Sequence, residues 1–527
     1  MEKWMGWIAY GILFFSFAFV PTKKALHMFQ QNRYELKRYT MWLIDRLHRL
    51  SRVDIMGVGG SIFLLAMGIN KSWVASVMII GLLVGWTLIV FQKESQKDYI
   101  KPLVYTARVK RQTVVMVLLY CILLIMLSFF KPYPLGLIAI LGLLKPWAFI
   151  YIMHFITLPI EKIIKKKYAD EAKLILKNHG QLTKIGITGS YGKTSSKNVL
   201  YSLLSEKYHT LMTPASYNTP MGITRTIREH LQPIHEVFIC EMGADHTGDI
   251  QELCNFVMPT IGLVTSIGPQ HLNTFGSIEN IIYEKMQLIE KLPETGLGII
   301  NLDNEYIRDY QIKNSCRLIR YGIHNQQGDY RVEAIEYSPK GSKFDVVFQA
   351  ENHHFETKLL GEHNIANIIA AIAIAQELGM SWDEMILAVK QLDFVEHRLQ
   401  LKKINGYTFI DNAFNSNPVG AAMSLEVLKT MPGKRVIVTP GMIDLGDQQD
   451  LKNKEFGERM QGCVDIAILV GEKQTQSIKE GLIATGFDLN EIHVCKTVKE
   501  AFDLVYRLAT SEDTILLEND LPDAFNH

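Results

Sequence analysis

The apolar residues of this chain follow one pattern in its first third and another in the remainder. In the first third they form long continuous runs at 4–20, 55–70, 73–91, 113–131 and 134–158. Each run approaches the roughly 17 to 25 apolar residues that a helix needs to cross a bilayer, so we expect about five spans. The pattern predicts an α-helical transmembrane domain over residues 1–165.

Basic residues between these runs predict their orientation. The loop between the first two runs and the loop after the third are rich in Lys and Arg, whereas the other two connections are short. Since basic loops stay on the cytoplasmic side, we expect the N-terminus outside and everything after Leu158 inside. Lys145 and Pro146 interrupt the last run, which fits either one bent span or a re-entrant pair.

Beyond Pro159 the pattern changes to short apolar strands that alternate with amphipathic helices. This alternation is typical of α/β domains with parallel sheets. We therefore expect two α/β domains, at 166–395 and 396–527, with the boundary just before Arg398. The expected strands are 184–188, 237–241, 261–265 and 298–302 in the first domain, and 409–411, 435–439, 466–470 and 514–518 in the second.

Composition excludes several classes of protein. The chain has 527 residues and a formal net charge of +1, so it has no general basic excess with which to bind nucleic acid. Its six cysteines form no CxxC pair and no repeated spacing. This arrangement indicates reduced thiols, neither a zinc site nor a disulfide framework.

The segment 185–195 carries the strongest chemical signal. An apolar strand leads into a turn with Gly189 and Gly192, and a helix is expected to start at Lys193, Thr194 and Ser195. Glycines allow backbone amides to approach phosphates, a lysine bridges the outer phosphates, and a threonine hydroxyl ligates magnesium. The spacing is GxxGKT, shorter than the common phosphate loop, and taken alone it also fits an ordinary strand-to-helix turn.

Other polar residues have two interpretations when each is considered alone. Glu241 ends an expected strand beside this loop, where magnesium needs an oxygen ligand, but a surface carboxylate fits equally well. His271 fits a hydrogen-bonded loop histidine, since magnesium prefers oxygen ligands. Lys285 fits a solvated helix lysine, and Arg398 and Asp411 fit exposed salt-bridge partners.

The order of these motifs over about 170–520 resembles the Mur ligase family, which includes folylpolyglutamate synthetases and cyanophycin-type ligases, and is most similar to its dipeptide-adding branch. The resemblance implies a phosphate-loop central domain and a Rossmann-like C-terminal domain. It also implies roles for individual residues. Expected catalytic residues are Lys193, Lys285 and Arg398; expected ATP contacts are Gly189, Gly192, Lys193, Thr194, Ser195, Asn301, Asp303, His363, Asn364, Asn367, Arg398 and Asp411; expected substrate contacts are Asn218 and Asn415; expected magnesium ligands are Thr194, Glu241, His271 and Lys285, the last as a carbamylated lysine.

Two departures from the family pattern concern substrates. The expected membrane spans occupy the positions of the uridine-nucleotide-binding domain found in peptidoglycan Mur ligases. At the C-terminus, the run Leu516–Asp523 replaces a Lys-Gly-Ser-Arg-like segment of the dipeptide-adding branch. Specificity for the incoming amine is therefore not transferable from the family.

These observations together predict a membrane-anchored ligase that uses ATP and Mg²⁺ to join a carboxylate to an amine through an acyl phosphate. The amine is expected from an amino acid or peptide, and the acceptor from a lipid-linked precursor of the cell envelope, in peptidoglycan biogenesis. The expected location is the plasma membrane of a bacterium, multi-pass, with the catalytic domains in the cytoplasm, in contact with membrane lipids and with room for a membrane-protein partner. One alternative is a polyglutamate-type polymer ligase. Another is an ATP-regulated transporter or sensor, which the near absence of ionisable residues from the spans disfavours.

Overall fold

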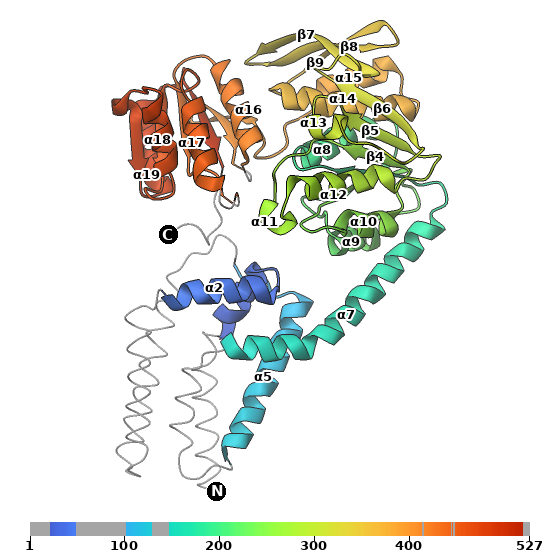
Figure 1. The fold of residues 1–527 in the computed structure, drawn as a ribbon, viewed down its shortest axis with the longest axis vertical. Coiled ribbons are helices and arrows are strands. Elements are labelled where there is room, and N and C mark those ends of the chain that lie inside the picture. The colour runs from blue at the N-terminus through green and yellow to red at the C-terminus, as the bar shows by residue number, and fades with distance from the viewer. Residues whose placement is uncertain are drawn as a thin grey trace. The chain divides into compact units, whose positions relative to one another are not determined.

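The computed structural model describes residues 22–48, 102–128, 147–413, 416–443, 445 and 448–519. The chain divides into two compact units, Met1–Lys167 and Tyr168–His527 (Figure 1). Each unit has its own buried core.

The first unit is helical in its described part. It contains α2 (Leu36–His48), α5 (Ala107–Ser128) and the first part of α7 (Trp147–Asn178). Its small core includes Phe29 and Tyr39. Arg111 of α5 donates from Nε and Nη2 to the carboxylate of Glu161 in α7, at 2.9 and 3.0 Å. Apolar side chains of α5 such as Ile125 remain exposed.

The predicted transmembrane domain is not found among the described residues. Within the described ranges, no helix is both long enough and apolar enough to cross a bilayer. α5 begins with a turn rich in Arg and Lys, and the apolar residues of α7 end before Glu161, so each described apolar stretch is shorter than the roughly 20 residues required. The predicted membrane domain and multi-pass plasma-membrane location are therefore wrong on this finding. The runs at 4–20, 55–70 and 73–91, and the first part of the last run, lie outside the described residues.

The second unit begins with a sheet of nine described strands in the order β2-β3-β1-β4-β5-β6-β7-β8-β9. The strands from β2 to β7 are parallel, and β8 and β9 continue as antiparallel neighbours. Their bounds are β1 Thr183–Thr188, β2 Thr210–Met212, β3 Val237–Glu241, β4 Ile261–Val264, β5 Leu297–Asn301, β6 Arg317–Gly322, β7 Tyr330–Ser338, β8 Gly341–Phe348 and β9 Glu351–Thr357.

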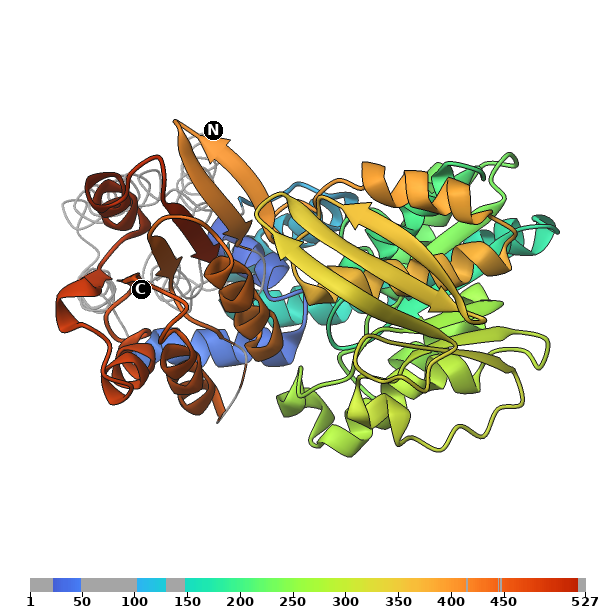
Figure 2. The ribbon, with the colours of Figure 1, turned by 90° about the horizontal axis from the view of Figure 1, so that it is seen from above.

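Helices cover both faces of this sheet. The core on one face includes α8 and α14, which pack together, and the core on the other includes α10 and α12 (Figure 1). Figure 2 shows the long strands β7 to β9, in yellow, beside α14 and α15. The described helices are α8 Lys193–Ser205, α9 Pro220–His230, α10 Asp249–Val257, α11 Leu272–Phe275, α12 Ile278–Glu290, α13 Glu305–Arg308, α14 Glu362–Glu377 and α15 Trp382–Gln391.

A second sheet follows in the order β10-β11-β15-β12-β13-β14, in which only the β10–β11 pairing is antiparallel. Its strands are β10 Gln400–Ile404, β11 Tyr407–Asn412, β12 Arg435–Thr439, β13 Ile466–Val470, β14 Ile492–Cys495 and β15 Thr514–Glu518; its helices are α16 Pro418–Lys429, α17 Gln449–Arg459, α18 Gln476–Ala484 and α19 Val498–Leu508.

The prediction of α/β architecture is confirmed. Strands β3, β4 and β5 read as nearly continuous apolar runs because both faces of a parallel sheet are covered. The carboxyl ends of parallel strands meet at one edge, which brings the segments after β1, β3 and β4 together. The domain limits 166–395 and 396–527 remain a prediction.

Candidate active site

The loop between β1 and α8 is shaped by two glycines. Gly189 has φ +150° and Gly192 has φ +82°, in a region that side chains rarely adopt. A Cβ on Gly189 would lie 2.2 Å from Thr265 Oγ1, so the loop packs directly against the end of β4. The Ser190 amide donates to the Ser266 carbonyl at 2.6 Å and fixes this approach. The backbone is therefore arranged as a phosphate loop at the start of a helix.

Lys193 bends back over this loop. Its Nζ donates to the carbonyls of Gly189 and Ser190 at 2.6 and 3.0 Å. Burial lowers the pKa of Lys193, the charge of Glu241 opposes this shift and the positive charge of Arg398 adds to it, and the resulting pKa is about 8. The nearby anion therefore favours the charged ammonium that a phosphate would need.

Glu241, the last residue of β3, is 2% exposed and lies beside the loop. Its Oε1 accepts hydrogen bonds from Thr194 Oγ1 at 3.3 Å and from Asn218 Nδ2 at 3.1 Å. Its Oε2 lies 3.0 Å from the ammonium of Lys197. A hydroxyl and a carboxylate oxygen next to a phosphate loop match the oxygen donors that Mg²⁺ prefers.

Lys285 and His271 lie near the same strand ends. Lys285 is 3% exposed, and its Nζ donates to the Ala244 carbonyl at 3.2 Å. Burial lowers its pKa to about 7, with a further contribution from the charge of Lys193. His271 Nε2 lies 3.4 Å from Asp245 Oδ1.

In the part of the chain that the structure describes, no group of three or more His, Cys, Asp or Glu side chains is arranged to hold a metal ion. Mg²⁺ in nucleotide sites is usually held by one or two protein oxygens together with phosphates and water. The pair of Thr194 and Glu241 fits that requirement.

A cavity of about 360 Å³ lies against this loop. Seven of the site residues predicted from the sequence line this cavity: Gly192, Ser195, Asn301, Asp303, His363, Asn367 and Arg398. Its remaining lining comes from both sheets and includes Tyr191, Tyr321, Asn412 and Ser416.

Two lining residues carry buried polar atoms without a hydrogen-bond partner among the described residues. They are Nδ1 of His363 and Nδ2 of Asn367. Asn367 is 6% exposed, and its Oδ1 accepts from Ser196 Oγ at 2.7 Å. Burial lowers the pKa of His363 to about 4, assisted by the charge of Arg398, so the imidazole is neutral at pH 7. Such unsatisfied groups indicate a missing polar ligand, and a purine ring offers both donors and acceptors.

Three predicted ATP contacts also have structural partners within the protein. Asn364 Nδ2 donates to the Leu360 carbonyl at 2.8 Å, at the start of α14. Asn301 Nδ2 donates to the Thr265 carbonyl at 3.0 Å. The Asp303 carboxylate accepts backbone N–H groups of residues 323, 324 and 325 at 2.6, 3.0 and 2.8 Å, which organises that turn at the rim of the cavity.

Arg398 and Asp411, the predicted contacts from the C-terminal part, differ in their position relative to the cavity. Arg398 lines the cavity, where burial lowers its pKa and the charge of Glu241 opposes the shift. Asp411 lies outside the lining and accepts from Lys402 Nζ at 2.6 Å and from His397 Nδ1 at 2.8 Å. Asn415 lies outside the described residues.

Sequence reasoning missed Lys197 and Tyr191. Lys197 follows Lys193 by four positions, so both lie on the same face of α8, a spacing that could have identified it. Tyr191 sits inside the loop itself, where Gly268 packs so closely that an added Cβ would lie 2.6 Å from the Tyr191 ring. The sequence carries no signal for that contact.

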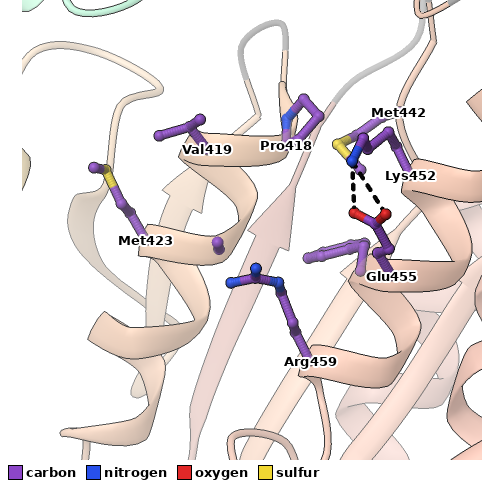
Figure 3. Close-up of a pocket in the computed structure, with 9 residues that line it drawn as sticks. Pro418, Val419, Met423, Met442, Lys452, Glu455 and Arg459 are labelled. Atoms are coloured by element: carbon purple, nitrogen blue, oxygen red, sulfur yellow. Dashed lines mark hydrogen bonds and ion pairs between the residues drawn. The ribbon is translucent and has the colours of Figure 1, made fainter. Parts of the chain in front are cut away.

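A second cavity, of about 340 Å³, lies between α16 and α17 (Figure 3). Its lining is mainly apolar and includes Val419 and Met423, which also line the first cavity. At its rim Lys452 Nζ contacts the Glu455 carboxylate at 2.8 and 3.1 Å (Figure 3). No predicted site residue lies there.

Two family models match the chain. The Mur ligase middle domain model matches residues 187–375, and the model of the Mur ligase, glutamate ligase domain matches 397–518. The UDP-N-acetylmuramoyl-tripeptide D-alanyl-D-alanine ligases of Escherichia coli (strain K12) and Bacillus subtilis (strain 168) are both 29% identical to it, over 56% and 52% of this chain. These matches cover 65% and 59% of the relatives, so the chain spans less than two thirds of their length.

Solved structures show the same fold. Crystal structure I of MurF from Acinetobacter baumannii has a TM-score of 0.62 at 24% identity and covers 69% of this chain and 78% of its own. MurF ligase from Thermotoga maritima in complex with ADP has a TM-score of 0.61 at 24% identity, over 68% of this chain and 80% of its own.

Proposed function

This chain belongs to the Mur ligase family, and from that premise we propose that it joins a carboxylate to an amine with hydrolysis of ATP to ADP and phosphate. One observation carries most of the proposal. His363 and Asn367, each with an unsatisfied polar atom, line the same cavity as Arg398 and the phosphate-loop residue Gly192. A nucleotide with its base at α14 and its phosphates at the loop would satisfy both ends of the cavity.

The first chemical step is in-line transfer of the γ-phosphoryl group to a carboxylate oxygen, with ADP as the leaving group. Lys193 and Arg398 neutralise the charge that develops on the transferred group. Mg²⁺, held by Thr194 and Glu241, would supply further charge neutralisation on the phosphates.

In the second step the amine nitrogen attacks the acyl carbon of the acyl phosphate. The C–O bond to phosphate breaks, the amide bond forms, and the amine proton passes to phosphate or water. Residues of both sheets line the cavity, so closure of the C-terminal part on the nucleotide would exclude water from this intermediate.

We extend the proposal to the substrates by resemblance to the relatives. The acceptor is a peptidoglycan precursor with a free carboxylate, and the amine comes from an amino acid or dipeptide. The expectation of a lipid-linked acceptor depended on the membrane domain and loses its basis with it. We also propose that Lys285 becomes carbamylated, since its low pKa supplies the neutral amine that reacts with carbon dioxide.

The test measures ADP release by the purified full chain with ATP, Mg²⁺, UDP-N-acetylmuramoyl-tripeptide and D-alanyl-D-alanine, with glutamate and single amino acids as competing amines. We expect ADP release that needs both acceptor and amine, and a product whose mass is the sum of the two less one water. Hydrolysis of ATP that no acceptor and amine pair stimulates would contradict the proposal. The Lys193→Ala variant serves as the control for contaminating ATPases.

A further inference from the structure

Lys197 is a buried lysine for which the proposed chemistry has no use. Its side chain is 1% exposed, and its Nζ lies 3.0 Å from Oε2 of Glu241. The same ammonium donates to the Ala215 carbonyl at 2.5 Å. A lysine is rarely this buried unless it has a specific partner.

The two oxygens of Glu241 have different surroundings. Oε2 faces Lys197, whereas Oε1 accepts from Thr194 and Asn218. A carboxylate at the end of a strand can rotate about its side-chain bonds, and the ion pair with Lys197 opposes that rotation. The bond to Ala215 also anchors the loop that carries Asn218, the second donor to Oε1.

We propose that Lys197 is a positioning residue for the divalent cation of the bound nucleotide. Its ion pair on Oε2 holds Glu241 so that Oε1 stays beside the Thr194 hydroxyl, where the cation takes both oxygens as ligands. Mg²⁺ demands near-ideal geometry at short distances, so a fixed carboxylate binds it better than a rotating one. This inference rests on the proposed function, because it takes Thr194 and Glu241 as the cation ligands.

A competing explanation is that Lys197 only compensates the charge of Glu241 and so stabilises the fold. Measurements of nucleotide binding distinguish the positioning role from the purely structural role. If Lys197 positions Glu241, its loss reduces the contribution of Mg²⁺ to nucleotide affinity and leaves the contacts of the base and the phosphate loop unchanged. Partners that orient a metal ligand typically contribute about 10- to 100-fold to metal affinity.

The experiment titrates the full chain with fluorescent ADP in the presence of Mg²⁺ and, separately, of EDTA. In the wild type we expect Mg²⁺ to tighten ADP binding. We expect Lys197→Met to lose about tenfold or more of this effect, with ADP affinity in EDTA unchanged. Lys197→Arg, which keeps the ion pair, should retain most of the Mg²⁺ effect. The control is Lys207→Met, since Lys207 pairs with Glu384 on the surface.

Three results would overturn the inference: an unchanged Mg²⁺ effect in Lys197→Met, a parallel loss of ADP affinity in EDTA, or a wild type whose ADP binding ignores Mg²⁺. If Lys197→Met does not fold, Lys197→Gln keeps a donor for Ala215 without the charge and should show the same selective loss. Failure of both neutral variants to fold would assign Lys197 a structural role and reject the inference. A wild type that does not bind ADP at all would instead reject the proposed function.

Discussion

Replacement of Lys285 by methionine is expected to stabilise the protein while it inactivates the enzyme. Burial lowers the pKa of this lysine from 10.5 to about 7. Each pKa unit corresponds to about 1.4 kcal/mol, so the charged lysine destabilises the native state by an amount on the order of 5 kcal/mol. Methionine has a similar length and no charge to desolvate, so Lys285→Met should recover much of this free energy.

The pH dependence has a definite sign. Below pH 7 the lysine is charged in both folded and unfolded states, and the full penalty applies. Between pH 7 and 10.5 the unfolded chain binds the proton that the native state has released, so wild-type stability rises with pH. The advantage of Lys285→Met should therefore be largest near pH 6 and fall to about half or less by pH 9.

The assay compares urea denaturation midpoints of wild type and Lys285→Met at pH 6 and pH 9, by circular dichroism, in buffers free of carbon dioxide. Lys291→Met is the matched control, because Lys291 follows the end of the same helix and is exposed. Its free energy of unfolding should change by less than about 0.5 kcal/mol at either pH. A variant that is less stable than wild type at pH 6, or whose advantage does not depend on pH, would refute the reasoning.

Further predictions concern the other polar groups of the site. Lys193→Ala should abolish ADP formation in a coupled assay with an unchanged circular dichroism spectrum; normal turnover would contradict the phosphate-loop assignment. Activity should fall when carbon dioxide is removed and return with bicarbonate, and a mass spectrum of unmodified Lys285 in the active, bicarbonate-supplied enzyme would argue against carbamylation. Because the pKa of His363 is about 4, ADP affinity measured by calorimetry should not change through protonation of this residue between pH 6 and 8, whereas a weakening with midpoint near pH 6.5 in wild type, absent from His363→Phe, would contradict its burial. Asp411→Asn should lower the free energy of unfolding by on the order of 1 to 3 kcal/mol and leave the KM for ATP nearly unchanged; a raised KM with unchanged stability would support the predicted ribose contact.

The features of the site that the sequence predicts depend on local patterns. Strands such as β3 and β13 are continuous apolar runs, so their limits follow from hydropathy alone. Glycines in the turn after β1 mark a backbone with positive φ, as found at Gly189 and Gly192. The parallel arrangement then brings the ends of β1, β3 and β4 together, which accounts for the proximity of Thr194 and Glu241.

The part that could not be predicted depends on tertiary partners. Nothing in the sequence shows that Asp303 organises a turn or that Asp411 joins a salt bridge. The antiparallel strands β8 and β9 mix polar and apolar residues, so apolar runs in the sequence do not predict them. Hydropathy also overestimated the length of the apolar helices in the first third of the chain. The described helices α5 and α7 include turns with charged residues, which shorten their apolar stretches.

The family resemblance supports the prediction of the nucleotide site, whereas the C-terminal run Leu516–Asp523 leaves the amine site unpredicted. Within the run Leu516–Asp523, Glu518 is 1% exposed at the end of β15. Its carboxylate accepts hydrogen bonds from Asn412 Nδ2 at 2.8 Å and from the Ser416 hydroxyl, and burial raises its pKa. Asn412 and Ser416 line the cavity. Glu518 therefore supports the cavity wall through Asn412 and Ser416, and we expect this support to influence which amine the cavity accepts.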